Sequence, residues 1–108
     1  MYRDKRPAVL VRATLSVLGS DEGGRRIESR YKWRPNHNFG APDGRVFYIG
    51  QVELSSEAID PGETQGVLVR FIDGPGLQDN LQPGRTWRIQ EGPNLIAVAK
   101  VVEVVGGT

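Results

Sequence analysis

The sequence contains no cysteine and only one histidine, His37. Without cysteine there is no disulfide framework and no thiolate-bound metal, and a single histidine cannot build a histidine-rich metal centre. The motif G-x-x-x-x-G-K-[ST], whose backbone amides hold nucleotide phosphates, is also absent. We therefore expect no metal, no cofactor and no bound nucleotide.

Long apolar runs are missing as well. A membrane-spanning helix needs about 20 consecutive apolar residues, and no run in this chain approaches that length. The first residues are charged and are not followed by the apolar stretch of a signal peptide. These patterns predict a cytoplasmic protein without a membrane partner.

Residue types for catalysis are scarce. His37 follows a proline and an asparagine, and no serine beside it suggests a nucleophile. We expect His37 to be an exposed polar residue. Asp21 and Glu22 lie in a glycine-flanked turn, where acidic residues are common. The sequence therefore predicts a protein that is not an enzyme.

Extended, alternating segments make up most of the chain. With 14 glycines and 7 prolines in 108 residues, the composition favours one all-β domain with many short turns. In residues 8–18, apolar side chains such as Val11 and Leu15 alternate with polar ones, as in a half-buried strand. Residues 95–105 contain five valines, whose branched side chains disfavour a helix.

Six strands follow from these patterns. They span residues 8–18, 25–39, 45–54, 63–73, 85–90 and 95–105. Pro35 makes the second strand an edge strand or interrupts it near Trp33. In the third strand Val46 is in phase with the core positions, and Gly50 indicates a bulge or the close approach of another backbone.

Six antiparallel strands favour a closed β-barrel, because closure removes exposed strand edges. The pattern alone does not separate a barrel from an open sandwich. Residues 55–62 are predicted to be a connection, residues 74–84 the longest loop and residues 91–94 the last turn. We expect a flexible N-terminus over 1–7, the barrel over 8–105 and a C-terminal tail over 106–108.

Short motifs in the same order resemble the third, C-terminal domain of translation elongation factor Tu. They are Leu15-x-Val17-Leu18-x-x-Asp21-Glu22-Gly23-Gly24-Arg25, Trp33-Arg34-Pro35-Asn36, Gly50-x-Val52-x-Leu54, Pro61-Gly62-Glu63 and Trp87-Arg88-Ile89-Gln90-Glu91-Gly92, followed by the last apolar strand. The resemblance covers residues 14–105 and implies a six-stranded antiparallel barrel that does no chemistry.

In that family the third domain packs against the other two domains, contacts the T-stem backbone of aminoacyl-tRNA and receives the nucleotide-exchange factor. The resemblance places Arg25, Asn36, Ile49, Asp73 and Gly92 at its tRNA-contact positions. Ile49 cannot hydrogen-bond a phosphate, and Asp73 would repel one. Arg25 and Gly92 are kept, although both also fit an ordinary turn.

The charge is distributed unevenly. Residues 1–34 carry nine basic and four acidic side chains, and residues 35–108 carry five basic and nine acidic ones. This pattern indicates either a basic face for a polyanion or halves that mix in space. Alternation along a strand would place the charged groups Arg30, Lys32 and Arg34 outward, and Tyr31 and Trp33 in a core or interface.

Two functions remain. The first is a non-catalytic module that binds a protein partner through the barrel surface, and the alternative is a module that binds RNA or tRNA with weakened phosphate contacts. The oligomeric state stays open. The predicted binding residues are Arg25, Arg30, Lys32, Trp33, Arg34, Asn36 and Gly92.

Overall fold

A computed structural model describes residues 7–42, 44 and 46–107. The predicted flexible segment lies outside this part of the chain except for Pro7, whose carbonyl accepts a hydrogen bond from the backbone amide of Asp73 at 2.9 Å. The elements are β1 Ala8–Val17, η1 Ser20–Glu22, β2 Ile27–Glu28, β3 Asn36–Asn38, β4 Tyr48–Leu54, β5 Ala58–Ile59, β6 Thr64–Ile72, η2 Gln78–Asn80, β7 Thr86–Glu91 and β8 Asn94–Gly107.

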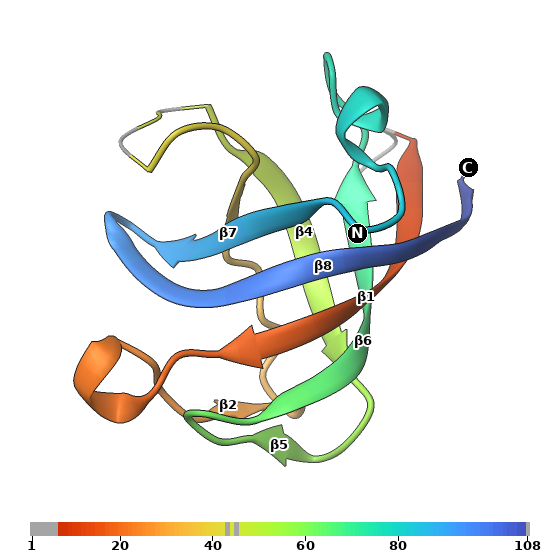
Figure 1. The fold of residues 1–108 in the computed structure, drawn as a ribbon. Coiled ribbons are helices and arrows are strands. Elements are labelled where there is room, and N and C mark those ends of the chain that lie inside the picture. Colours follow the sequence, from red (N-terminus) through yellow and green to blue (C-terminus); the bar gives the residue numbers. More distant parts are fainter. Residues whose placement is uncertain (1–6, 43, 45, 108) are drawn as a thin grey trace, which may run out of the picture.

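Within the described residues, six strands close into an antiparallel barrel in the order β1-β6-β4-β3-β7-β8. Both η1 and η2 are single 3-10 turns. In Figure 1 β8 crosses the view between β7 and β1, which closes the cylinder. The predicted six-stranded closed barrel is confirmed, and the open sandwich is excluded.

The alternation of side chains along the strands builds the core. Val11, Ala13 and Leu15 of β1 are completely buried, whereas Arg12 between them is exposed. Aromatic rings fill much of the interior. Phe39 stacks on Trp87 with ring centroids 5.0 Å apart, and such pairs stabilise a core beyond the area that they bury.

His37 belongs to this core, so the prediction of an exposed histidine is wrong. Asn36 and Asn38 flank it on the opposite face of β3, where Asn38 is covered by the following loop, and strand alternation turns the His37 ring inward, where it is 0% exposed. Trp87 Nε1 donates a hydrogen bond to His37 Nδ1 at 3.0 Å. An indole N–H only donates, so Nδ1 is unprotonated and Nε2 donates to the carbonyl oxygen of Gly50 at 2.9 Å.

Gly50 fits closely into this arrangement. A β-carbon at this position would lie 3.0 Å from His37 Nε2 and 3.0 Å from the Phe71 ring. The predicted bulge or close backbone approach is therefore wrong: Gly50 pairs in regular register with Phe71, and the groups that approach it are side chains.

The segment over residues 25–39 differs from the single strand predicted. It forms β2, a turn closed by the hydrogen bond from Tyr31 N to Glu28 O, an isolated bridge between Trp33 and Val52, and the short strand β3. The interruption near Trp33 is confirmed. Tyr31 lies in the turn and is 62% exposed, so it does not share a buried face with Trp33.

Strand β2 lies outside the barrel and pairs with β5, a strand within the predicted connection over 55–62. The two form a small sheet beside the barrel, below β1 and β6 in Figure 1. Ile27 faces Ile59 in this pair, and both are buried in the common core. Apolar alternation in so short a segment is too weak to predict such a pair.

Loop 39–47 also departs from the prediction, because β4 begins only at Tyr48 and Val46 is 74% exposed. Asn38 fixes the first residues of this loop. Its side-chain Nδ2 donates to the carbonyl oxygen of Ala41 at 3.0 Å and to Gln90 Oε1 at 2.8 Å, and its Oδ1 accepts from the amide of Gly40. These bonds hold the start of the loop against the outer side of β3 and β7.

The C-terminal half follows the predicted pattern with two differences. Loop 74–84 contains η2 and buries Leu77 and Leu81 against the core. Strand β8 runs further than expected, because Gly106 and Gly107 pair with β1 rather than forming a tail.

Candidate binding surface

Glu91 joins two of the predicted binding residues at the end of the β7–β8 hairpin. Arg25, from the turn after β1, donates from Nε to Glu91 Oε1 at 2.7 Å and from Nη2 to Oε2 at 2.6 Å. Trp33 Nε1 donates to the same Oε2 at 3.3 Å. The hydrogen bonds from Arg25 lower the pKa of Glu91 below its usual range, and the same contact raises the pKa of Arg25.

This fork occupies the guanidinium of Arg25. A bidentate arginine–carboxylate pair satisfies both groups, so a phosphate would have to displace Glu91 to bind there. Glu91 was missing from the predicted site, and the one available signal was its position directly before Gly92 in the last shared motif.

Other arginines of the basic N-terminal part also have acidic neighbours. Arg26 Nη1 lies 2.6 Å from Asp60 Oδ1, and Arg30 Nε lies 3.5 Å from Glu28 Oε1. The Arg26–Asp60 and Arg25–Glu91 pairs each join one half of the chain to the other, whereas both partners of the Arg30 pair lie in the N-terminal half. Of the two interpretations of the charge pattern, mixing describes this part of the surface.

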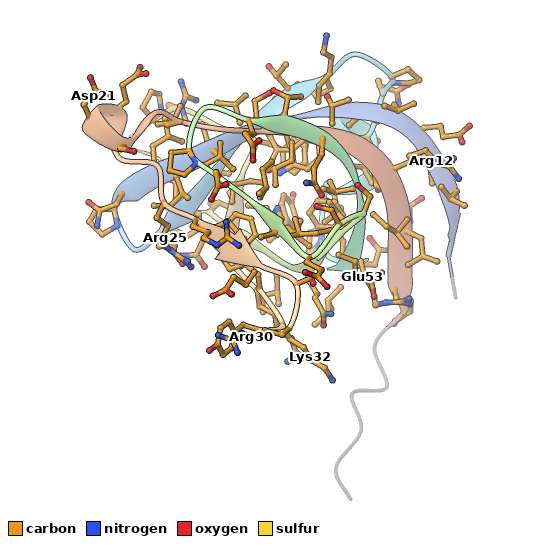
Figure 2. All side chains as sticks on the ribbon, turned by 90° about the horizontal axis from the view of Figure 1, so that it is seen from below. Arg12, Asp21, Arg25, Arg30, Lys32 and Glu53 are labelled. Atoms are coloured by element: carbon orange, nitrogen blue, oxygen red, sulfur yellow. The ribbon has the colours of Figure 1, made fainter. Side chains whose placement is uncertain are left out.

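Arg30 and Lys32 lie on the turn after β2, and Lys32 lines a hollow of about 300 Å³ together with Arg25 and Trp33. Figure 2 shows both side chains projecting from the turn after β2, with Arg25 closer to the ribbon. The guanidinium of Arg30 lies over the ring of Tyr31, 4.7 Å from its centroid. Arg25, Lys32 and Trp33 of the predicted site therefore share one hollow, whereas Arg30 does not line it.

Asn36 and Gly92 come together in an open groove of about 340 Å³. Phe47, Pro42 and Pro93 supply most of its apolar wall. Gly92 has a φ angle of 57°, which confirms that the turn requires a left-handed residue. Groove and turn form one surface on loop 39–47 and the β7–β8 hairpin.

Ile49 and Arg34 extend this surface across β4. Ile49 pairs with Asn36 and is 51% exposed, and Arg34 borders a second hollow that Ile49 also lines. Asp73 is half-buried, and its Oδ2 accepts a hydrogen bond from Gln78 at 2.9 Å. The five tRNA-contact positions implied by the resemblance therefore present a paired arginine, an amide, an isoleucine, a bonded carboxylate and a glycine turn.

The described residues hold no group of three or more histidine, aspartate or glutamate side chains placed to bind a metal ion. No helix among them has the length and apolar character needed to cross a bilayer. In comparison with known families, no protein-family model matches the chain.

Proposed function

We propose that this protein is a non-catalytic binding module, similar to the third domain of elongation factor Tu, that recognises a protein partner through its barrel surface. The binding surface is the groove of Asn36 and Gly92 with its continuation over Ile49 and Arg34. The Arg25–Glu91 pair and Trp33 form its border.

The exposed apolar side chains next to Asn36 carry this proposal. Phe47 is 36% exposed and lines the groove, and Ile49, across the strand pair from Asn36, is 51% exposed. Apolar groups surrounded by polar and charged ones are typical of protein interfaces. A nucleic-acid surface would instead offer several unpaired cations to the phosphates, and Arg25 at the border of this one is paired with Glu91.

The RNA alternative has one observation in its favour. In the part of the chain that the structure describes, Lys32 and Arg34 form no ion pair, and both are exposed. Tyr31 is exposed beside them with Arg30 over its ring. Cations around an exposed aromatic ring can bind phosphates and stack a base.

Parallel NMR titrations separate the two functions. The ¹⁵N-labelled protein is titrated with the nucleotide-exchange factor of elongation factor Tu and with tRNA, each at ~50 and ~200 mM salt. A protein partner should shift the amides of Asn36, Phe47 and Gly92 with little dependence on salt. RNA should shift residues 30–34, and its affinity should fall steeply at the higher salt.

A pair of variants tests the groove itself. Phe47→Lys should abolish the shifts caused by the protein partner, whereas Val104→Lys, an exposed strand residue of β8, should leave them unchanged. Binding of tRNA alone would replace this proposal by the RNA alternative. Failure of both macromolecules to bind at ~100 μM would remove both.

A further inference from the structure

The second hollow, of about 220 Å³, lies on the outer face of β1, β6 and β4 and combines an apolar wall with a basic rim. Ala8, Ile49 and Ile72 form the wall. Ala8 pairs with Ile72, and Ile49 is level with Ile72 because the next residues, Gly50 and Phe71, pair with each other.

The basic rim consists of Arg34 and Arg70, and the strand register places them relative to each other. Arg70 of β6 pairs with Gln51 of β4. Trp33 pairs with Val52 and Asn36 with Ile49, so Arg34 is level with Gln51. The order across the surface is therefore Arg70, Gln51, Arg34, two residues along the strands from the isoleucines and on the same outer face.

The charge of this rim is not balanced locally. Neither Arg34 nor Arg70 forms an ion pair within the described residues, and no acidic residue lines the hollow. Elsewhere on the surface Arg12 and Arg26 each have a carboxylate partner. Asp73 follows Ile72 but accepts its hydrogen bond from Gln78 and does not line the hollow.

We propose that this hollow binds a protein segment that presents one apolar side chain between acidic residues. The inference rests on the proposed function and names the chemistry of the partner. The apolar side chain enters the hollow against Ile49 and Ile72, where burial of apolar area drives association. Carboxylates on either side pair with Arg34 and Arg70, whose planar guanidinium groups match a carboxylate bidentately.

RNA and the residues that precede Pro7 match the chemistry of the hollow less well than an acidic protein segment does. RNA would need an exposed ring for stacking, and the only ring that lines the hollow, Phe71, is 0% exposed. The residues that precede Pro7 carry three basic side chains and one acid, so their net charge has the same sign as the rim. A second copy of the chain remains as an occupant for the experiment to detect.

A defined peptide tests the proposal. The probe is a fluorescent twelve-residue peptide with acetylated and amidated ends, in which a central leucine lies between two pairs of glutamates in a glycine–serine frame. We expect saturable, sub-millimolar binding and NMR shifts at the amides of Ile49, Gln51 and Ile72. Peptides with glutamine for glutamate, or serine for leucine, should bind roughly tenfold more weakly, the ratio for about 1.4 kcal/mol.

Variants of the protein locate the contacts. Arg34→Gln and Arg70→Gln should each weaken the peptide roughly three- to tenfold, as expected for loss of one charge-assisted contact at a solvent-accessible site. Ile49→Ser should weaken it similarly. Arg12→Gln is the matched control, because it removes the same charge from the outer face of β1 away from the hollow and should not change the affinity. All these side chains are exposed, and the ¹⁵N spectrum of each variant verifies its fold.

Several results would overturn the inference. One is that the peptide fails to bind at ~1 mM, and another is that its binding is unaffected in the double Arg34→Gln and Arg70→Gln variant. A third is that single-stranded RNA binds more tightly and shifts the same amides. The last is that sedimentation reveals a dimer that both substitutions dissociate. If the peptide fails while the protein partner still shifts Asn36 and Gly92, the binding-module proposal stands without this hollow. If the peptide binds but no protein shifts Asn36 and Gly92, the proposed function fails and the hollow is an independent site.

Discussion

Acid should destabilise this protein through one buried ring, that of His37. Burial lowers the pKa of His37 from 6.5 to about 4, since protonation would place a charge in an apolar core. Protonation would also put a hydrogen on Nδ1, which now accepts the indole N–H of Trp87. The folded protein therefore keeps the ring neutral well below the pH at which the unfolded chain takes up a proton.

The sign and size of the effect follow from these two values. Between pH 6.5 and about 4 the unfolded state binds one more proton at this residue, so the free energy of unfolding falls as the pH falls. A difference of about 2.5 pKa units is worth roughly 3 kcal/mol, at about 1.4 kcal/mol per unit. A small domain has a total stability of only about 5–15 kcal/mol.

Urea denaturation at several pH values, monitored by tryptophan fluorescence, measures this decrease in the free energy of unfolding. The unfolding free energy should drop by about 3 kcal/mol between pH 7 and pH 4. Below pH 4 His37 should lower it little further, because both states then bind the proton. In His37→Phe the pH dependence in this window should largely disappear. The variant should also be less stable at pH 7, since the Trp87 N–H and the Gly50 carbonyl each lose a partner, at roughly 1–3 kcal/mol apiece.

Two results would refute the reasoning. One is a wild-type protein whose stability changes by less than about 1 kcal/mol across the window, and the other is a His37→Phe variant that keeps the full pH dependence. Nitrogen-15 NMR of the imidazole offers a direct check, because Nε2 should carry the proton throughout the neutral range.

Two further changes test the close packing and the Arg25–Glu91 pair. Gly50→Ala should cost about 1–3 kcal/mol by forcing a methyl group against the imidazole of His37, whereas Gly66→Ala, with open space around it, should change the urea midpoint little. The coupling energy between Arg25 and Glu91, measured in a double-mutant cycle of Arg25→Gln and Glu91→Gln, should be less than about 1 kcal/mol, because solvent screens both side chains. Since the pKa of Glu91 is lowered in the folded state, the wild-type advantage should be present above about pH 4.5 and fade as the pH falls below it.

The barrel was predictable where side chains alternate over long segments. Strands β1 and β6 each bury every second residue over most of their length, so their inward faces follow directly from the sequence. Short strands are different. β3 has only three residues, and it is placed by its two neighbours in the sheet rather than by its own pattern.

The buried histidine shows why part of the core was missed. His37 is satisfied by Trp87, 50 residues away in the chain, and by Gly50, 13 residues away. A polar residue with polar neighbours indicates exposure unless such distant partners are known. The same limit applies to Val46. Its apolar side chain fits a strand pattern, but the residue lies exposed in the loop whose start is held by Asn38.

The candidate surface was predicted only as separate residues. Arg25, Asn36 and Gly92 were predicted from motifs that resemble those of a known family, but their arrangement depends on contacts between distant turns. Glu91 binds Arg25 across 66 residues of sequence, and no local pattern links the two. Arg70 was not singled out, because its relation to Arg34 depends on the register of β6, β4 and the Trp33 bridge.

The pairing of β1 with β8 has a consequence for the chain during its synthesis. Val9 pairs with Gly107, so the ladder that closes the cylinder joins residues 98 positions apart, from 9 to 107. A ribosome adds about 5–20 residues per second, which leaves the inward valines and leucine of β1 without this neighbour for several seconds. Until then β6 is the only barrel strand that can shield β1, and completion of the fold belongs to the slow, high-contact-order class of β proteins.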